Sequence, residues 1–107
     1  MEKSNASMDH TALSAKVKAE GEGIIITDAM LEGCSFVDGI DELFEMEPDN
    51  AAGVAGHIFS KIFGVKVEQS QCDGFNLAAM EWSGTVEGYE FEIIKDGDGW
   101  FIDFSEA

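Results

Sequence analysis

The sequence predicts an α+β protein in which a four-stranded antiparallel meander packs against a helix, with a shorter helix and strand before them. Residues 65–104 alternate strand-like runs with Gly-containing turns, and residues 47–64 repeat apolar side chains at helical spacing. The chain has 107 residues, 45% of them hydrophobic, which is enough apolar surface for one core. We therefore expect a single domain over residues 9–107, after a flexible polar tail at residues 1–8.

The N-terminal region supports two interpretations. Residues 9–19 fit the alternation of a strand, and Leu13 and Val17 also fit one side of a helix; we favour the helix. Ile24–Ile26 are three consecutive β-branched residues, which lose side-chain freedom in a helix. This run predicts a strand over residues 23–27.

The stretch DGIDELFEMEPDN, residues 38–50, holds six carboxylates in thirteen positions and no basic residue. Ile40, Leu43 and Phe44 fall on one side of a helix, so we expect a short amphipathic helix with Asp38 at its N-cap. Clustered carboxylates also suit a divalent cation, but no histidine follows at the spacing of a di-metal site, and we predict no metal or cofactor. Four acids form the solvated side of this helix and are candidate contacts for a partner: Asp38, Asp41, Glu42 and Glu45.

The next segment, residues 47–64, predicts the main helix. Pro48 suits its first turn, and Gly64 suits the position after its last residue. His57 and Lys61 are expected on the side away from the core. The side chains expected to face the core are Val54, Ala55, Ile58, Phe59 and Ile62.

Four strands are predicted in the C-terminal half, over residues 65–72, 75–86, 89–95 and 100–104. Asp73-Gly74 predicts a tight hairpin turn between the first two, because such turns need positive φ angles. Glu87-Gly88 is a weaker turn signal, and Asp96–Gly99 predicts a longer turn. The alternation of the second strand slips near Ala78-Ala79, which predicts a β-bulge.

Charge is the most unusual property of the sequence. Twenty-two acidic residues face six lysines, arginine is absent, and the net charge is −16. Such a surface repels nucleic acid and anionic membranes and attracts basic protein surfaces. No apolar run is long enough for a membrane span, and Cys34 and Cys72 form no CxxC motif. We therefore expect reduced thiols and a cytoplasmic location, without direct binding to nucleic acid or membranes.

Sequence motifs for catalysis are absent. The chain contains no GxSxG nucleophile, no Walker loop and no GxGxxG motif after a strand. Asp96-x-Asp98 begins like a calcium-binding loop, but Phe101 and Ala107 stand where such a loop needs Gly and Glu. These observations favour a protein without catalytic activity.

The final segment, GYEFEIIKDGDGWFIDF, resembles the C-terminal half of NTF2-like, more broadly cystatin-like, α+β rolls. Many of these domains end in a hydrophobic strand, a Lys-Asp-Gly turn and a Trp-containing last strand. The resemblance extends over residues 49–104. It implies a curved sheet with a cavity, in a family that includes both enzymes and non-catalytic binders.

Two functional hypotheses follow. The first is a small acidic, non-catalytic interaction protein that binds a basic protein partner, as an inhibitor, a nucleic-acid mimic or an immunity protein does. Glu90 and Glu92 join its candidate contacts, because alternate strand residues lie about 6.6–6.8 Å apart on one face, similar to successive phosphates. The second is an NTF2-like small-ligand-binding domain or enzyme with an apolar pocket in a curved sheet. The candidate pocket residues are Tyr89, Phe91, Trp100 and His57. The sequence does not decide the oligomeric state, and a homodimer is one of the alternatives.

Overall fold

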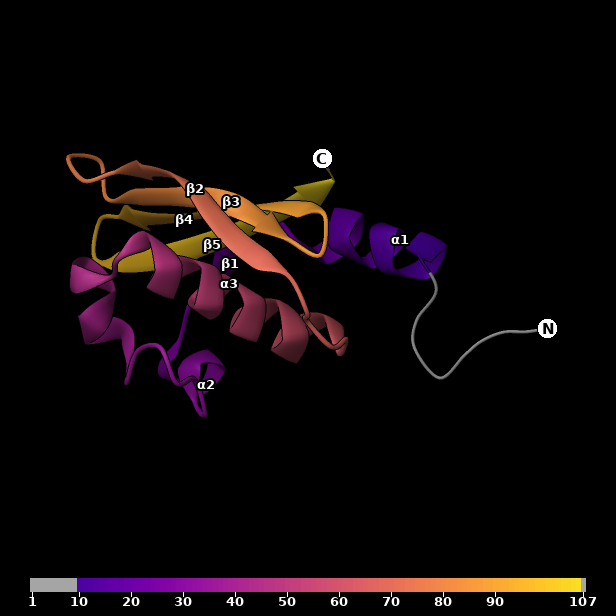
Figure 1. Cartoon of the computed structure of the whole chain (residues 1–107), viewed down its shortest axis with the longest axis horizontal. Coiled ribbons are helices and arrows are strands. Elements are labelled where there is room, and N and C mark those ends of the chain that lie inside the picture. The colour runs from indigo at the N-terminus through magenta and orange to yellow at the C-terminus, as the bar shows by residue number, and fades with distance from the viewer. Residues whose placement is uncertain (1–9, 107) are drawn as a thin grey trace.

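The computed structural model describes residues 10–106 (Figure 1). The predicted tail at residues 1–8 lies outside this range, as do Asp9 and Ala107. An antiparallel sheet forms one layer of the fold, and the long helix α3, Pro48–Phe63, forms a second layer against it. The predicted α+β class is confirmed.

The sheet has five strands in the order β1-β5-β4-β3-β2, each antiparallel to its neighbours. The prediction of four strands was wrong by one, because Ile24–Ile25 pairs with β5 and adds a short edge strand within the predicted span 23–27. The other four strands form the predicted meander. The strands are β1 (Ile24–Ile25), β2 (Ser70–Asn76), β3 (Glu81–Val86), β4 (Tyr89–Asp96) and β5 (Gly99–Glu106).

Both ends of α3 follow the sequence signals. Pro48 stands in its first turn, where the missing N–H costs nothing. Gly64 ends the helix in the left-handed region, with a φ of 69°, and its N–H donates to the Ser60 carbonyl at 2.9 Å. The helix therefore begins and ends where the sequence predicts.

Aromatic rings join α3 to the sheet. Phe59 and Phe63 meet Phe104 of β5 edge to face, with ring centroids 5.0 and 5.8 Å apart. Phe59 also lies 5.7 Å from the Tyr89 ring of β4. Full burial of one such side chain stabilises the fold by about 1.5–3 kcal/mol. These contacts fill the space between helix and sheet.

Helix α1, His10–Glu20, resolves the ambiguity over residues 9–19 in favour of a helix. Gly21 is the next residue, and its backbone lies close to the backbone of β5. A Cβ on Gly21 would lie 2.5 Å from the carbonyl oxygens of both Val17 and Phe104. The Phe104 N–H donates to the Gly21 carbonyl at 2.7 Å, so the end of α1 is tied to the sheet.

Two short helices lie between β1 and α3: α2 (Asp28–Leu31) and the 3-10 helix η1 (Ile40–Glu45). The second is the predicted short helix, but its N-cap is Gly39, so the prediction of Asp38 was wrong by one residue. A long-range contact sets this start, because the Asp28 carboxylate accepts the Ile40 N–H at 3.0 Å. The Asp38 N–H donates instead to the Glu42 carboxylate at 2.6 Å.

The predicted hairpin turn at Asp73-Gly74 was wrong. These residues lie inside β2, where the register with β3 shifts on either side of Asp73, as in a β-bulge. The chain turns instead at residues 77–80, where Met80 has a φ of 53°. The bulge predicted near Ala78-Ala79 was therefore also wrong, because those residues form the turn.

Gly84 of β3 makes room for the bulge in β2. A Cβ on Gly84 would lie 1.9 Å from the Gln71 carbonyl oxygen and 2.8 Å from the Cys72 Cα, and both are backbone atoms. Asp73-Gly74 therefore forms a bulge and not a turn, because Gly84 of β3 lets β2 approach β3 closely.

Replacing Gly84 by alanine should lower the free energy of unfolding by about 2–4 kcal/mol, because the backbone of β2 must move. Urea unfolding measures the change. Gly99→Ala is the matched control, since the nearest atom to its added methyl would be 3.4 Å away. We expect this control to change stability by less than about 1 kcal/mol, and equal losses at both positions would contradict the role of Gly84.

Candidate partner-binding surface

The face of the sheet opposite α3 carries no helix among residues 10–106 (Figure 1). Along β4, Tyr89 and Phe91 are buried in the core, whereas Glu90 and Glu92 are exposed on the opposite face. We call this surface the bare face. Its outward-pointing side chains on β2 to β5 are Gln71, Asp73, Asn76, Glu81, Ser83, Thr85, Glu90, Glu92, Ile94, Asp96, Phe101, Asp103 and Ser105.

A depression of about 380 Å³ hollows the bare face. Two cross-strand rows of side chains cross it: Ser83, Glu92 and Asp103 in one, and Thr85, Glu90 and Ser105 in the other. Glu90 lies between two hydroxyl side chains, whereas Glu92 lies between the hydroxyl of Ser83 and the carboxylate of Asp103. The depression is therefore lined by polar groups with a strong excess of negative charge.

Two of these carboxylates face each other directly. Glu92 and Asp103 are cross-strand partners, and like charges at such positions destabilise a sheet. The Asp103 carboxylate also accepts the N–H of Gly23, which holds it at the edge of the depression. None of the outward-pointing positions of β2 to β5 is basic, so no side chain of the bare face neutralises this pair.

Three lysines have contacts away from the bare face. Lys61 donates to the Ala29 carbonyl at 3.0 Å, and Lys95 donates to the Gly97 carbonyl. Lys18 of α1 pairs with a carboxylate at the end of β5, at 3.5 Å. These ammonium groups hold local structure, and the negative charge of the depression stays open to an external cation.

A short apolar row lies beside the acids. Ile94 of β4 stands opposite Phe101 of β5, and Phe101 stands opposite Ile25 of β1. Ile25 is 58% exposed. The bare face thus combines a charged depression with an adjacent apolar row.

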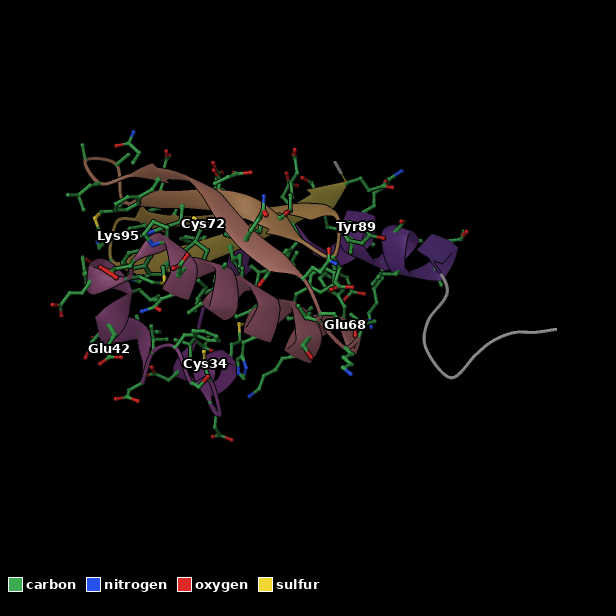
Figure 2. All side chains as sticks on the ribbon, in the orientation of Figure 1. Cys34, Glu42, Glu68, Cys72, Tyr89 and Lys95 are labelled. Atoms are coloured by element: carbon green, nitrogen blue, oxygen red, sulfur yellow. The ribbon has the colours of Figure 1, made fainter. Side chains whose placement is uncertain are left out.

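The six candidate partner-binding acids do not form one surface. Glu90 and Glu92 lie on the bare face. The other four lie on or next to η1, on the side of the sheet that carries α3, where Figure 2 shows Glu42. All six are exposed. The structure therefore separates them into two acidic patches.

The four candidate pocket residues do not line a common cavity in the described structure. Tyr89, Phe91 and Trp100 are at most 4% exposed and belong to the filled core. His57 lies elsewhere, with its Nε2 3.0 Å from the Glu32 carbonyl oxygen, beside a groove of about 420 Å³ along α3. The three aromatic residues are therefore part of the core, and His57 lies apart from them.

Several residues of the depression were not predicted as site residues. Asp103 and the hydroxyls of Ser83, Thr85 and Ser105 reach it only through the cross-strand register. Within β5, Asp103 points away from the buried Trp100, Ile102 and Phe104, but the pattern of a single strand does not say which acids of neighbouring strands lie beside it.

The described carboxylates all lie at the surface. No charged side chain among residues 11–106 is buried, and no group of three potential metal ligands is found in the part of the chain that the structure describes. No helix within residues 10–106 has the length and apolar character needed to cross a membrane.

Comparison with known proteins adds no relative. No protein-family model, curated protein or solved structure matches this chain. The resemblance of residues 49–104 to NTF2-like or cystatin-like rolls therefore stays a prediction.

Cys72 lies next to the bulge, half-buried, and its Sγ donates to the Gly74 carbonyl at 3.3 Å. Burial raises the pKa of the Cys72 thiol, and the charge of Asp73 raises it further. The thiolate form is therefore disfavoured in the folded protein.

In a Cys34→Ser background, Cys72 should react with iodoacetamide several-fold more slowly than free cysteine in a mildly alkaline buffer. Asp73→Asn should speed the reaction, because loss of the neighbouring negative charge favours the thiolate. Mass spectrometry follows the alkylation. A reaction faster than that of free cysteine would show that burial does not control this thiol.

Proposed function

We propose that this chain is a small acidic interaction protein without catalytic activity, and that its bare face binds a basic protein partner. One observation supports this most directly. Glu90, Glu92 and Asp103 share one depression on a sheet face that carries neither a helix nor an outward-pointing basic residue among the described residues. A basic surface supplies the charge that this face lacks.

Electrostatics favours such a complex both before and after contact. The net charge of −16 steers a basic partner toward the protein and raises the association rate. At contact, each close pair of opposite charges is worth about 1 kcal/mol in water, and more where the depression excludes solvent. Because the Debye length is about 8 Å at physiological ionic strength, the attraction weakens as salt is added.

The spacing of the acids favours partners that bind nucleic acid. Glu90 and Glu92 follow β4 at the strand repeat of about 6.6–6.8 Å, similar to successive phosphates. Hydroxyls beside them add hydrogen bonds, and the apolar row of Ile94 and Phe101 supplies a margin that can be desolvated. An inhibitor, a nucleic-acid mimic or an immunity protein uses a surface of this kind. The unpaired thiols Cys34 and Cys72 fit a cytoplasmic setting.

Neutralising the acids of the bare face tests the proposal. The triple variant Glu90→Gln/Glu92→Gln/Asp103→Asn should bind a basic ribonuclease and a basic DNA-binding domain at least about tenfold more weakly than wild type at low salt, a loss of about 1.4 kcal/mol. Titration calorimetry at low and high salt measures both affinities and their salt dependence.

The control is Glu20→Gln/Glu22→Gln/Glu32→Gln, which removes the same charge from three exposed positions outside the bare face. This control should keep most of the affinity. Equal losses in the two triple variants, or an affinity that does not change with salt, would contradict the proposal.

Glu92→Gln alone should have opposite effects on stability and binding. Removal of the repulsion with Asp103 should raise the free energy of unfolding by about 0.2–1 kcal/mol. The same change should weaken binding of the basic partner. Thermal unfolding of the free variant measures the first effect, and a loss of stability would show that these two charges do not repel in the folded protein.

A further inference from the structure

A row of four aromatic rings runs through one end of the protein. The order of contacts is Phe75, Trp82, Trp100 and Phe44, with neighbouring ring centroids 5.3, 5.8 and 5.2 Å apart. Both indoles are buried, whereas Phe75 and Phe44 at the two ends are 44% and 49% exposed. Leu77 follows in the β2–β3 turn and is 63% exposed. We call this surface the aromatic end, defined by Phe44, Phe75 and Leu77.

The apolar groups of the aromatic end lie among acids. Asp41 and Glu45 flank Phe44 in η1, and both are exposed. Asp73 and Glu81 point to the bare face instead, so the acidic margin of the aromatic end consists of Asp41 and Glu45. Exposed apolar groups within a charged margin commonly mark sites of protein interaction.

The Phe44 ring already binds a cation. The Lys95 ammonium lies 5.5 Å from the centroid of this ring and donates to the Gly97 carbonyl, and Figure 2 shows Lys95 at this end of the sheet. A ring face that accepts one ammonium group favours cationic side chains in general. Lys95 already fills this ring face, so the aromatic end offers a partner apolar contact beside the carboxylates of Asp41 and Glu45.

We propose that the aromatic end is a second docking surface, which binds a segment of the partner that carries apolar side chains between lysines or arginines. This inference rests on the proposed function, since it adds an apolar anchor to the electrostatic contact of the bare face. The acidic margin matches the basic side chains of such a segment. A second copy of this chain does not fit, because two molecules of net charge −16 repel each other.

Two synthetic peptides of equal charge separate the two surfaces. One is an amphipathic peptide of leucine and lysine at helical spacing, and the other replaces every leucine by serine. Both should bind at low salt through charge. The leucine peptide should bind at least about tenfold more tightly, and its advantage should persist at high salt, because apolar contact is not screened.

Single substitutions in the aromatic end should show which residues provide the higher affinity for the leucine peptide. Phe44→Ser, Phe75→Ser and Leu77→Ser should each reduce the advantage of the leucine peptide by about three- to tenfold, because each removes an exposed apolar contact. Phe36→Ser is the matched control, since Phe36 is 46% exposed but lies against Gly53 of α3. This control should leave the advantage unchanged.

Nuclear magnetic resonance gives a second readout that does not depend on variants. The chain has two tryptophans, and both belong to the aromatic row. Their two indole N–H signals should shift when the leucine peptide binds, and should stay in place with the serine peptide. The Trp82 Nε1 is buried without a hydrogen-bond partner in the described structure. A shift of its signal therefore does not report the loss of a hydrogen bond within the protein.

The outcomes distinguish the two proposals. Equal affinities for both peptides, with unmoved indole signals, would overturn the second docking surface and leave the bare-face proposal in place. An advantage of the leucine peptide that survives all three variants, or is lost in Phe36→Ser alone, would also overturn it. Failure of both peptides to bind at low salt would contradict the proposed function itself.

Discussion

The rest of this structure depends on one packing interaction, the contact of α3 with a single face of the sheet. Phe59 and Phe63 of the helix fit against Phe104 and Tyr89, and the remaining inward side chains close around them. Burial of an unpaired carboxylate would cost several kcal/mol, so this core holds none. A chain of net charge −16 can fold because all of its described charges stay outside this contact.

One-sided coverage of the sheet has a direct consequence for function. The strands present every second side chain to the face that α3 leaves uncovered, and in this chain many of those side chains are acids and hydroxyls. Glu92 and Asp103 stand opposite each other at a cost to stability. A surface that keeps such a repulsive pair is better explained by contact with a cationic partner than by stability of the free protein.

Local signals predicted much of the fold. The spacing of apolar residues with Pro48 and Gly64 identified α3, and the alternation of Tyr89 and Phe91 with Glu90 identified β4 and its exposed side. Contacts between distant residues decided the rest, and no local pattern contains them. Asp73-Gly74 forms a bulge because Gly84 lets β2 and β3 approach each other. The 3-10 helix η1 begins at Ile40, after its N-cap Gly39, because the Asp28 carboxylate accepts the Ile40 N–H.

The same limit applies to the candidate site. Glu90 and Glu92 could be identified from their own strand, but Asp103 and the flanking hydroxyls join them only through cross-strand register. The acids of residues 38–45 and those of β4 look alike in the sequence, yet the fold places them on opposite sides of the sheet. The pocket considered for Tyr89, Phe91 and Trp100 depended on a curved sheet, and in the structure these side chains fill the core.

The central claim is that the sheet face left uncovered by α3 is where a basic protein binds. Methyl-resolved nuclear magnetic resonance, with a basic DNA-binding domain titrated at low salt, tests it most directly. The account predicts that the methyl signals of Thr85 and Ile94 on the bare face move first, while those of the core residues Val54 and Ile58 in α3 stay in place. Shifts confined to α3 and η1, with Thr85 and Ile94 unmoved at saturation, would contradict it.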